Sequence, residues 1–221
     1  HGTPTWVYAA AAIEGRYRAL VSALAEAGLD ARIHYAMKAN DALAIVRLLG
    51  TLGAGADVVS GGEVHAARAA GIAPADIVFS GVGKTEAELR AALAAGVGQV
   101  NVESAEELAM LDALARAMGL RAPVALRVNP DVDAGTHAKI TTGRAENKFG
   151  IPIDTAPALY ARAANSAGIR VRGVAVHIGS QITALAPFRA AYARLAELVR
   201  ALRAEGLPVE RIDCGGGVGI P

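Results

Sequence analysis

Seven short apolar segments, each separated from the next by a stretch with helical periodicity, constrain the fold of this 221-residue chain more than any other feature. They are apolar on both faces, as expected of strands in a buried parallel sheet. The segments are Ile33–Met37, Ala56–Val59, Ile77–Phe79, Gln99–Val102, Val124–Val128, Val171–Ile178 and Arg211–Cys214. This alternation favours an α/β fold of the (β/α)8 barrel type over an open sheet. The eighth strand is expected to lie outside this chain.

The intervening segments carry their own helix signals. Capping-box patterns begin at Thr85 and Ser104, each with a glutamate three residues later. Before the first strand, one face of a predicted helix collects apolar side chains and is expected to pack. That face comprises Ile13, Tyr17, Leu20, Val21 and Leu24.

Composition narrows the class of protein. Hydrophobic residues make up 53% of the chain and charged residues 19%, which suits a sizeable core. A net charge of +1 without a basic block disfavours nucleic acid or an anionic membrane as the main partner. No apolar run reaches membrane-spanning length, no signal pattern opens the chain, and the single Cys214 fits a reducing compartment. We expect a soluble, cytoplasmic protein, of which residues 1–221 form an incomplete barrel domain.

Polar residues and glycines gather at the predicted strand ends, which share one rim of a barrel. They are Lys38, Asp57, Glu63, Arg127, His177, Ser180, Gly215, Gly216 and Gly217. A rim lysine can form a Schiff base in a low-polarity site, although a surface lysine that ends a strand is the simpler interpretation. Consecutive glycines suit a phosphate, or only a tight turn.

Other motifs have structural interpretations. Glu63 completes a capping box with Ser60, and a structural role is as plausible as a functional one. His177 fits a packed core or, better, a place against a flat ring. The segment from Gly81 to Thr85 resembles part of a P-loop, but Val78 stands where that motif needs glycine. The histidines share no metal-ligand spacing, so no metal is predicted, and Cys214 is expected to be a buried filler.

Five motifs together resemble a known family. In order and spacing they are similar to the bacterial diaminopimelate decarboxylases over essentially the whole chain. The motifs are Tyr35–Asn40, Val128–His137, Lys148–Ile151, His177–Gln181 and Gly215–Ile220. That family belongs to fold-type III of the pyridoxal 5'-phosphate (PLP) enzymes, the alanine racemase-like barrels. The resemblance implies PLP as cofactor, a homodimer, and decarboxylation of meso-2,6-diaminopimelate to L-lysine and CO2 in lysine biosynthesis.

The resemblance also implies a role for each rim residue. Lys38 would bind PLP covalently and His177 would stack on its ring, the two forming the catalytic pair. Ser180 and the glycines Gly215, Gly216 and Gly217 would hold the phosphate. Asp57 and Glu63 would lie near the lysine, and Arg127 beside the cofactor.

Part of the family pattern does not occur in residues 1–221. The Glu-Pro-Gly-Arg segment of the eighth strand and the C-terminal β-domain are absent from this stretch, so we expect these residues alone to be inactive. Three alternatives stay open: an arginine or ornithine decarboxylase or a racemase, a non-catalytic PLP-binding protein, and a barrel that binds a phosphorylated sugar without PLP.

Overall fold

The computed structural model describes residues 1–132 and 149–220 and contains one parallel sheet. The strand order is β1-β2-β3-β4-β5-β7-β8, and β6 pairs with β5. The strands are β1 (His34–Ala36), β2 (Gly55–Val58), β3 (Ile77–Phe79), β4 (Gln99–Val102), β5 (Ala122–Asn129), β6 (Ile151–Pro152), β7 (Ile169–Val176) and β8 (Arg211–Asp213). Every pairing is parallel, as consecutive strand–helix units require.

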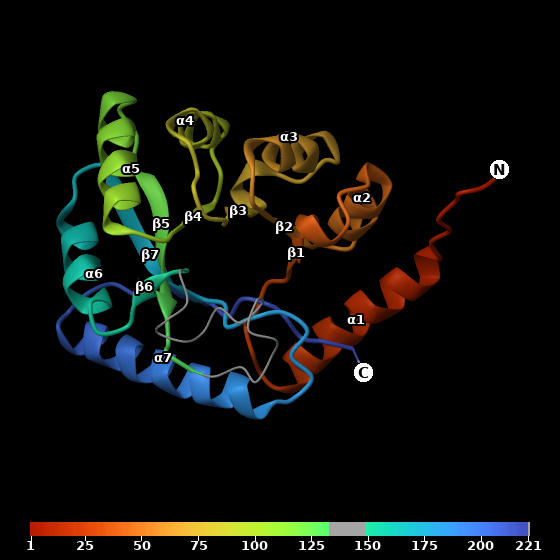
Figure 1. The fold of residues 1–221 in the computed structure, drawn as a ribbon. Coiled ribbons are helices and arrows are strands. Elements are labelled where there is room, and N and C mark those ends of the chain that lie inside the picture. The colour runs from red at the N-terminus through yellow and green to blue at the C-terminus, as the bar shows by residue number, and fades with distance from the viewer. Residues whose placement is uncertain (133–148, 221) are drawn as a thin grey trace.

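Helices cover the outer side of the curved sheet (Figure 1). They are α1 (Ala10–Glu26), α2 (Leu43–Thr51), α3 (Gly61–Ala69), α4 (Glu86–Ala95), α5 (Ala105–Ala117), α6 (Ala156–Asn165) and α7 (Ala186–Ala204), with 3-10 turns η1 (Met37–Ala39) and η2 (Pro74–Asp76). The main core lies between strands and helices and includes Phe79, Leu111 and Tyr160, all fully buried. The described part of the molecule is thus a barrel-type arc.

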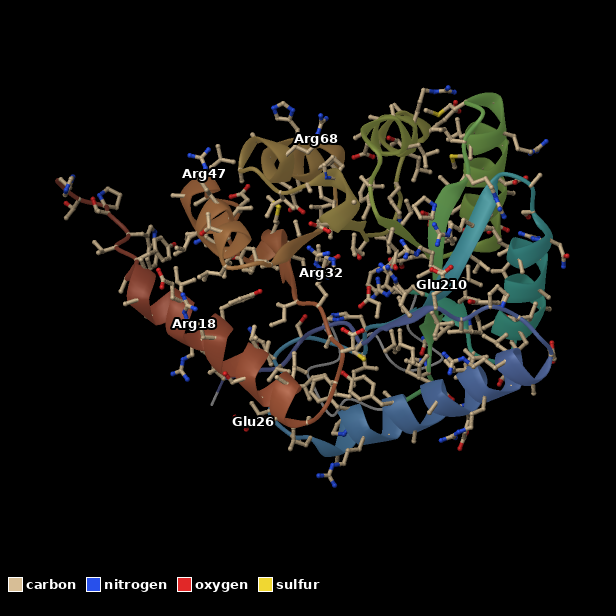
Figure 2. The ribbon with its side chains drawn as sticks, turned by 180° about the vertical axis from the view of Figure 1, so that it is seen from behind. Arg18, Glu26, Arg32, Arg47, Arg68 and Glu210 are labelled. Carbon is tan, nitrogen blue, oxygen red and sulfur yellow. The ribbon has the colours of Figure 1, made fainter. Side chains whose placement is uncertain are left out.

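The two rims of the sheet carry different residues. Arg47 and Arg68 extend outwards from α2 and α3, whereas Arg32 lies two residues before β1 and Glu210 directly precedes β8 (Figure 2). Arg32 and Glu210 therefore mark the amino-terminal rim of the sheet. The opposite, carboxyl-terminal rim carries the predicted functional residues. Among the described residues, no helix combines the length and apolar composition that crossing a membrane requires.

The predicted α/β barrel-type fold is confirmed, and all seven predicted strands occur within about two residues of their expected bounds. Three details differ. The run from Ile33 ends in a 3-10 turn, so Lys38 lies just beyond the strand, and the two-residue strand β6 was not predicted. Cys214, expected in the core, is exposed. His137 and Lys148 of the predicted motifs lie outside the described residues.

Helix α1 departs from the expectation of a packed apolar face. None of its residues is buried, and Leu20 and Val21 are 49% and 42% exposed. Only Ile13 and Tyr17 pack, against a small cluster that includes Ile45 of α2. In Figure 1, α1 stands off from the sheet near its open end, where β1 and β8 are the outermost strands. Within the described residues the sheet does not close, so α1 lies at an open edge rather than against a continuous barrel wall.

Candidate functional site

The parallel register brings the predicted polar residues to one rim. Lys38 lies in η1 directly after β1, and Asp57 of β2 lies opposite Ala36 of β1. Arg127 is in β5, and His177 follows β7. The charges of Lys38 and Arg127 both influence the pKa of Asp57 and of His177. Asp57 and His177 therefore each lie within electrostatic reach of both Lys38 and Arg127, although these residues are far apart in the sequence.

Asp57 is a buried carboxyl group in the interior of the arc. Its Oδ1 accepts a hydrogen bond of 2.6 Å from the Ser80 hydroxyl, which follows β3. Burial raises the pKa of Asp57 from 3.8 to about 6, and the nearby Asp213 adds to that effect. The Ser80 hydrogen bond and the charges of Lys38 and Arg127 act in the opposite direction. Removal from water outweighs these stabilising partners, as for other buried carboxyl groups.

A chain of hydrogen bonds crosses the interior beneath the rim. The Asn101 amide nitrogen donates to the Ser80 hydroxyl at 3.0 Å and to Asp213 Oδ2 at 2.8 Å. Asn101 Oδ1 accepts from Gln99 Nε2 at 2.8 Å. Barrel interiors are usually filled by branched apolar side chains, so this polar interior is distinctive. Sequence reasoning missed Ser80, Asn101 and Asp213; polar residues at alternate positions of an otherwise apolar strand, as in Gln99-x-Asn101, were the available signal.

Arg127 already has a protein partner at the rim. Its guanidinium forms a 2.6 Å ion pair with Glu103, which follows β4, and lies 5.9 Å from the centre of the Phe149 ring. Both charged side chains are largely buried, with 13% and 7% exposure. Glu103 therefore fixes the direction of Arg127, and it is another residue that sequence reasoning missed.

His177 is half-buried at the end of β7. Burial, together with the charges of Arg127 and Lys38, lowers its pKa to about 4, although Asp213 opposes the shift. The ring is therefore neutral at pH 7. Its Nδ1 accepts a 3.4 Å hydrogen bond from the Gly216 N–H, which links the ring to the glycine run. A neutral flat ring in this position is suited to stacking.

The glycine run Gly215–Gly217 packs closely against the loop after β7. A Cβ at Gly215, whose φ is +68°, would collide with the Val176 carbonyl, and one at Gly217, at φ +95°, with the Gly179 carbonyl. At Gly216 a Cβ would meet nothing within 4 Å. Glycine is thus required for fit at the two outer positions, while the middle one faces open space.

Ser180 lies on the loop that borders this run. Two residues further on, the Ile182 N–H donates to the Gly217 carbonyl at 2.9 Å, and the Gly219 N–H donates to the Ile182 carbonyl at 2.9 Å. These bonds form a short parallel bridge between Ile182 and Val218. Backbone hydrogen bonds thus join the loop that carries Ser180 to the glycine run, with which Ser180 was predicted to group.

Glu63 has a clear structural contact. Its Oε2 accepts a 2.7 Å hydrogen bond from the Val59 N–H, and its own N–H donates to the Ser60 hydroxyl at 3.2 Å. Ser60 is the N-cap of α3, as the capping pattern predicts, but the carboxylate reaches one residue further back than in a standard capping box. Glu63 therefore ties the end of β2 to the start of α3.

A cavity of about 580 Å³ lies between α5 and α6. Its lining includes Glu103 and Arg162, but none of the predicted rim residues. In residues 1–132 and 149–220 no three His, Cys, Asp or Glu side chains are grouped to hold a metal ion.

The rim residues fit a phosphorylated aromatic aldehyde such as PLP. An exposed primary amine, Lys38, is suited to a carbonyl, and the neutral His177 ring to an aromatic face. The open space over Gly216 lets a phosphate approach the backbone. Lys38, His177 and Gly216 would be the residues that hold the aldehyde, the ring and the phosphate.

Comparisons with known proteins agree with this fit. Residues 10–221 match the family described as pyridoxal-dependent decarboxylase, pyridoxal binding domain. A diaminopimelate decarboxylase of Pseudomonas aeruginosa is 52% identical over 99% of this chain and 52% of its own length. The crystal structure of Helicobacter pylori diaminopimelate decarboxylase complexed with L-lysine has a TM-score of 0.96, with 40% identity over 100% of this chain and 55% of that one. Lysine decarboxylase of Selenomonas ruminantium has a TM-score of 0.81, with 27% identity over 95% of this chain and 51% of that one.

The chain spans about half the length of the curated relatives it matches. The match to the pyridoxal-binding domain family leaves out only residues 1–9 of the described stretch. The chain belongs to the pyridoxal-dependent decarboxylases, of which residues 10–221 represent the pyridoxal-binding domain.

Proposed function

We propose that the complete gene product containing this chain decarboxylates meso-2,6-diaminopimelate to L-lysine and CO2 with PLP. The observation that carries this proposal is the contrast in identity, 52% to a diaminopimelate decarboxylase and 27% to a lysine decarboxylase, each over nearly all of this chain. The binding of L-lysine in the Helicobacter pylori structure is consistent with lysine as the product.

Each rim residue then has a task. Lys38 would hold the cofactor covalently through its side-chain amine. His177, kept neutral by burial, presents a flat face to the pyridine ring. Gly215, Gly216 and Gly217, with Ser180, hold the phosphate. PLP, when bound, supplies an electron sink for the electron pair that remains after CO2 leaves.

The charged residues set the electrostatics of that pocket. With a pKa of about 6, Asp57 is mostly ionised at pH 7 and balances the positive charge of Lys38. Arg127, fixed by Glu103, lies beside the cofactor. Glu63 keeps the end of β2, and hence Asp57, in place through its bond to the Val59 N–H.

We further propose that the complete protein is a cytoplasmic homodimer. The family resemblance supports the dimer, and the single exposed cysteine suits a reducing compartment. Size-exclusion chromatography with light scattering of the complete protein tests the dimer directly.

The functional test uses the complete gene product. CO2 release is measured with meso-diaminopimelate, L-lysine, L-ornithine and L-arginine, and Lys38→Ala is compared with the unsubstituted protein. We expect release from meso-diaminopimelate alone, and its loss in the variant. Borohydride reduction of the PLP-loaded protein, followed by peptide mapping, should label Lys38.

Three outcomes would contradict the proposal. Faster release from ornithine or arginine would move the protein to another branch of the family. Covalently bound PLP that no amino acid converts would indicate a PLP-binding protein without catalysis. Dominant labelling of Lys84, Lys139 or Lys148 would remove Lys38 from its assigned role.

A further inference from the structure

The carboxylate of Asp213 connects the glycine run to the polar interior. Its Oδ1 accepts a 2.9 Å hydrogen bond from the Gly215 N–H, and its Oδ2 accepts a 2.8 Å bond from Asn101 Nδ2. Asp213 ends β8, whereas Asn101 lies in β4 on the other side of the arc. One side chain thus joins a surface loop to a strand that is 112 residues away in the sequence.

Asn101 is a rigid anchor for this contact. Asn101 is only 3% exposed, and its side chain also forms hydrogen bonds with Gln99 and Ser80. Its backbone carbonyl accepts a 2.9 Å bond from the buried Lys84 ammonium group. With so many partners, Asn101 cannot turn without breaking other buried hydrogen bonds, each of which is costly to lose.

The glycine run needs such an anchor, because glycine loses more conformational freedom on ordering than any other residue. Its far end is held by the Ile182 N–H on the Gly217 carbonyl. Its near end is held by Asp213 on the Gly215 N–H. Gly216, the position open to a ligand, lies between these two fixed points.

A carboxylate this close to a phosphate site is unfavourable on charge alone, since two anions repel each other. Donors from Asn101 and Gly215 compensate the Asp213 charge and direct one of its oxygens into the interior. We propose that Asp213 is a positioning residue, which orders the Gly215–Gly217 backbone so that it receives the cofactor phosphate. This inference rests on the proposed function, because it assumes that PLP is the ligand.

The test separates the phosphate from the rest of the cofactor. In the complete gene product, the affinities for PLP and for pyridoxal, which lacks the phosphate, are measured by the absorbance of the lysine-bound form. Loss of a hydrogen bond to a charged group leads us to expect about ten- to hundredfold weaker PLP binding in Asp213→Ala. Pyridoxal binding should stay unchanged. Asn101→Ala, which removes the anchor but not the carboxylate, should show the same selective loss.

Two further variants complete the design. Asp112 also accepts a bond from a glycine N–H, that of Gly168, at 2.8 Å, but lies on α5 away from the rim. Asp112→Ala is therefore the matched control and should leave the ratio of PLP to pyridoxal affinity unchanged. Asp213→Asn keeps an acceptor for Gly215 but turns an amide towards Asn101, so its PLP affinity should be intermediate. Asp213→Asn also provides the test if Asp213→Ala does not fold.

The outcomes are distinguishable. Equal losses for PLP and pyridoxal, or no loss of PLP affinity in Asp213→Ala and Asp213→Asn, would overturn the positioning role while leaving the proposed function intact. If the unsubstituted protein bound no PLP at Lys38, the proposed function would fail, and this inference with it.

Discussion

At the residue scale, burial decides the protonation of the two central groups of the site. Burial raises the pKa of Asp57 to about 6 and lowers that of His177 to about 4, in both cases against part of the surrounding charge. Both shifts disfavour the charged form, which is the signature of removal from water. Burial thus influences the charge states of the rim residues as much as ion pairs do.

This predicts a measurable pH dependence for Asp57. Because its folded-state pKa is raised, its contribution to stability is fully present below pH 3.8 and is lost as the pH rises through about 6. Asp57→Asn does not titrate and should escape this loss. Between pH 4 and pH 7 the free energy of unfolding of the variant, relative to the unsubstituted PLP-free protein, should rise by on the order of 2 kcal/mol.

Urea unfolding of the complete protein at both pH values measures this difference. Asp30→Asn, at an exposed position, gives the baseline for neutralising one carboxylate. A stability difference between Asp57→Asn and the unsubstituted protein that stays constant over this range would show that Asp57 ionises as it does in the unfolded chain.

At the element scale, a buried lysine joins three elements behind the rim. Lys84 lies in the loop between β3 and α4, and its side chain is 1% exposed. It forms a 2.8 Å ion pair with Glu107 of α5 and donates to the carbonyls of Gly81 and of Asn101 in β4. The lysine of this P-loop-like sequence is thus directed inward and bound by protein groups.

Lys84→Met should therefore be strongly destabilising. It leaves the Glu107 carboxylate, only 11% exposed, without its ion-pair partner, which should cost about 3 kcal/mol of unfolding free energy. Denaturant unfolding of the complete protein measures this loss. Adding Glu107→Gln removes the stranded charge while keeping an acceptor for the Glu103 N–H, so the double variant should recover part of it. A double variant less stable than Lys84→Met would refute the buried-charge explanation.

The elements themselves were largely predictable, because strand and helix signals are local. The full capping box at Thr85 and Glu88 of α4 is present as the pattern predicts. Helix α1 has an equally clear apolar face but contains no fully buried residue, since burial depends on what the rest of the fold supplies. Strand β6 is too short, at two residues, for periodicity to reveal it.

The site was predictable only in part. The strand-end rule brought Lys38, Asp57, Arg127 and His177 to one rim, because that rule follows from parallel topology alone. The Asp213–Asn101 bond and the Arg127–Glu103 pair depend on which strands face each other and on side-chain directions. Neither is encoded in a local motif, so sequence reasoning could not supply them.

At the scale of the whole molecule, the described residues form an arc with two outer strands, β1 and β8. Unpaired backbone groups on outer strands favour pairing with another chain. Apolar side chains lie exposed on α1 and around the C-terminal segment, among them Leu20, Val21, Val218 and Ile220. Apolar surface of this kind promotes association.

Residues 1–221 expressed alone should therefore self-associate. We expect the sedimentation coefficient to increase with protein concentration, and no measurable CO2 release from meso-diaminopimelate, because the rim residues Lys38 and Gly216 are exposed to water rather than enclosed. The complete gene product should release CO2 under the same conditions. Replacing Leu20 and Val21 of α1 by glutamate should weaken the association if the apolar face of α1 takes part. A monomer of residues 1–221 that turned over substrate at the rate of the complete protein would show that this arc is a sufficient active unit and that its exposed edges are inert.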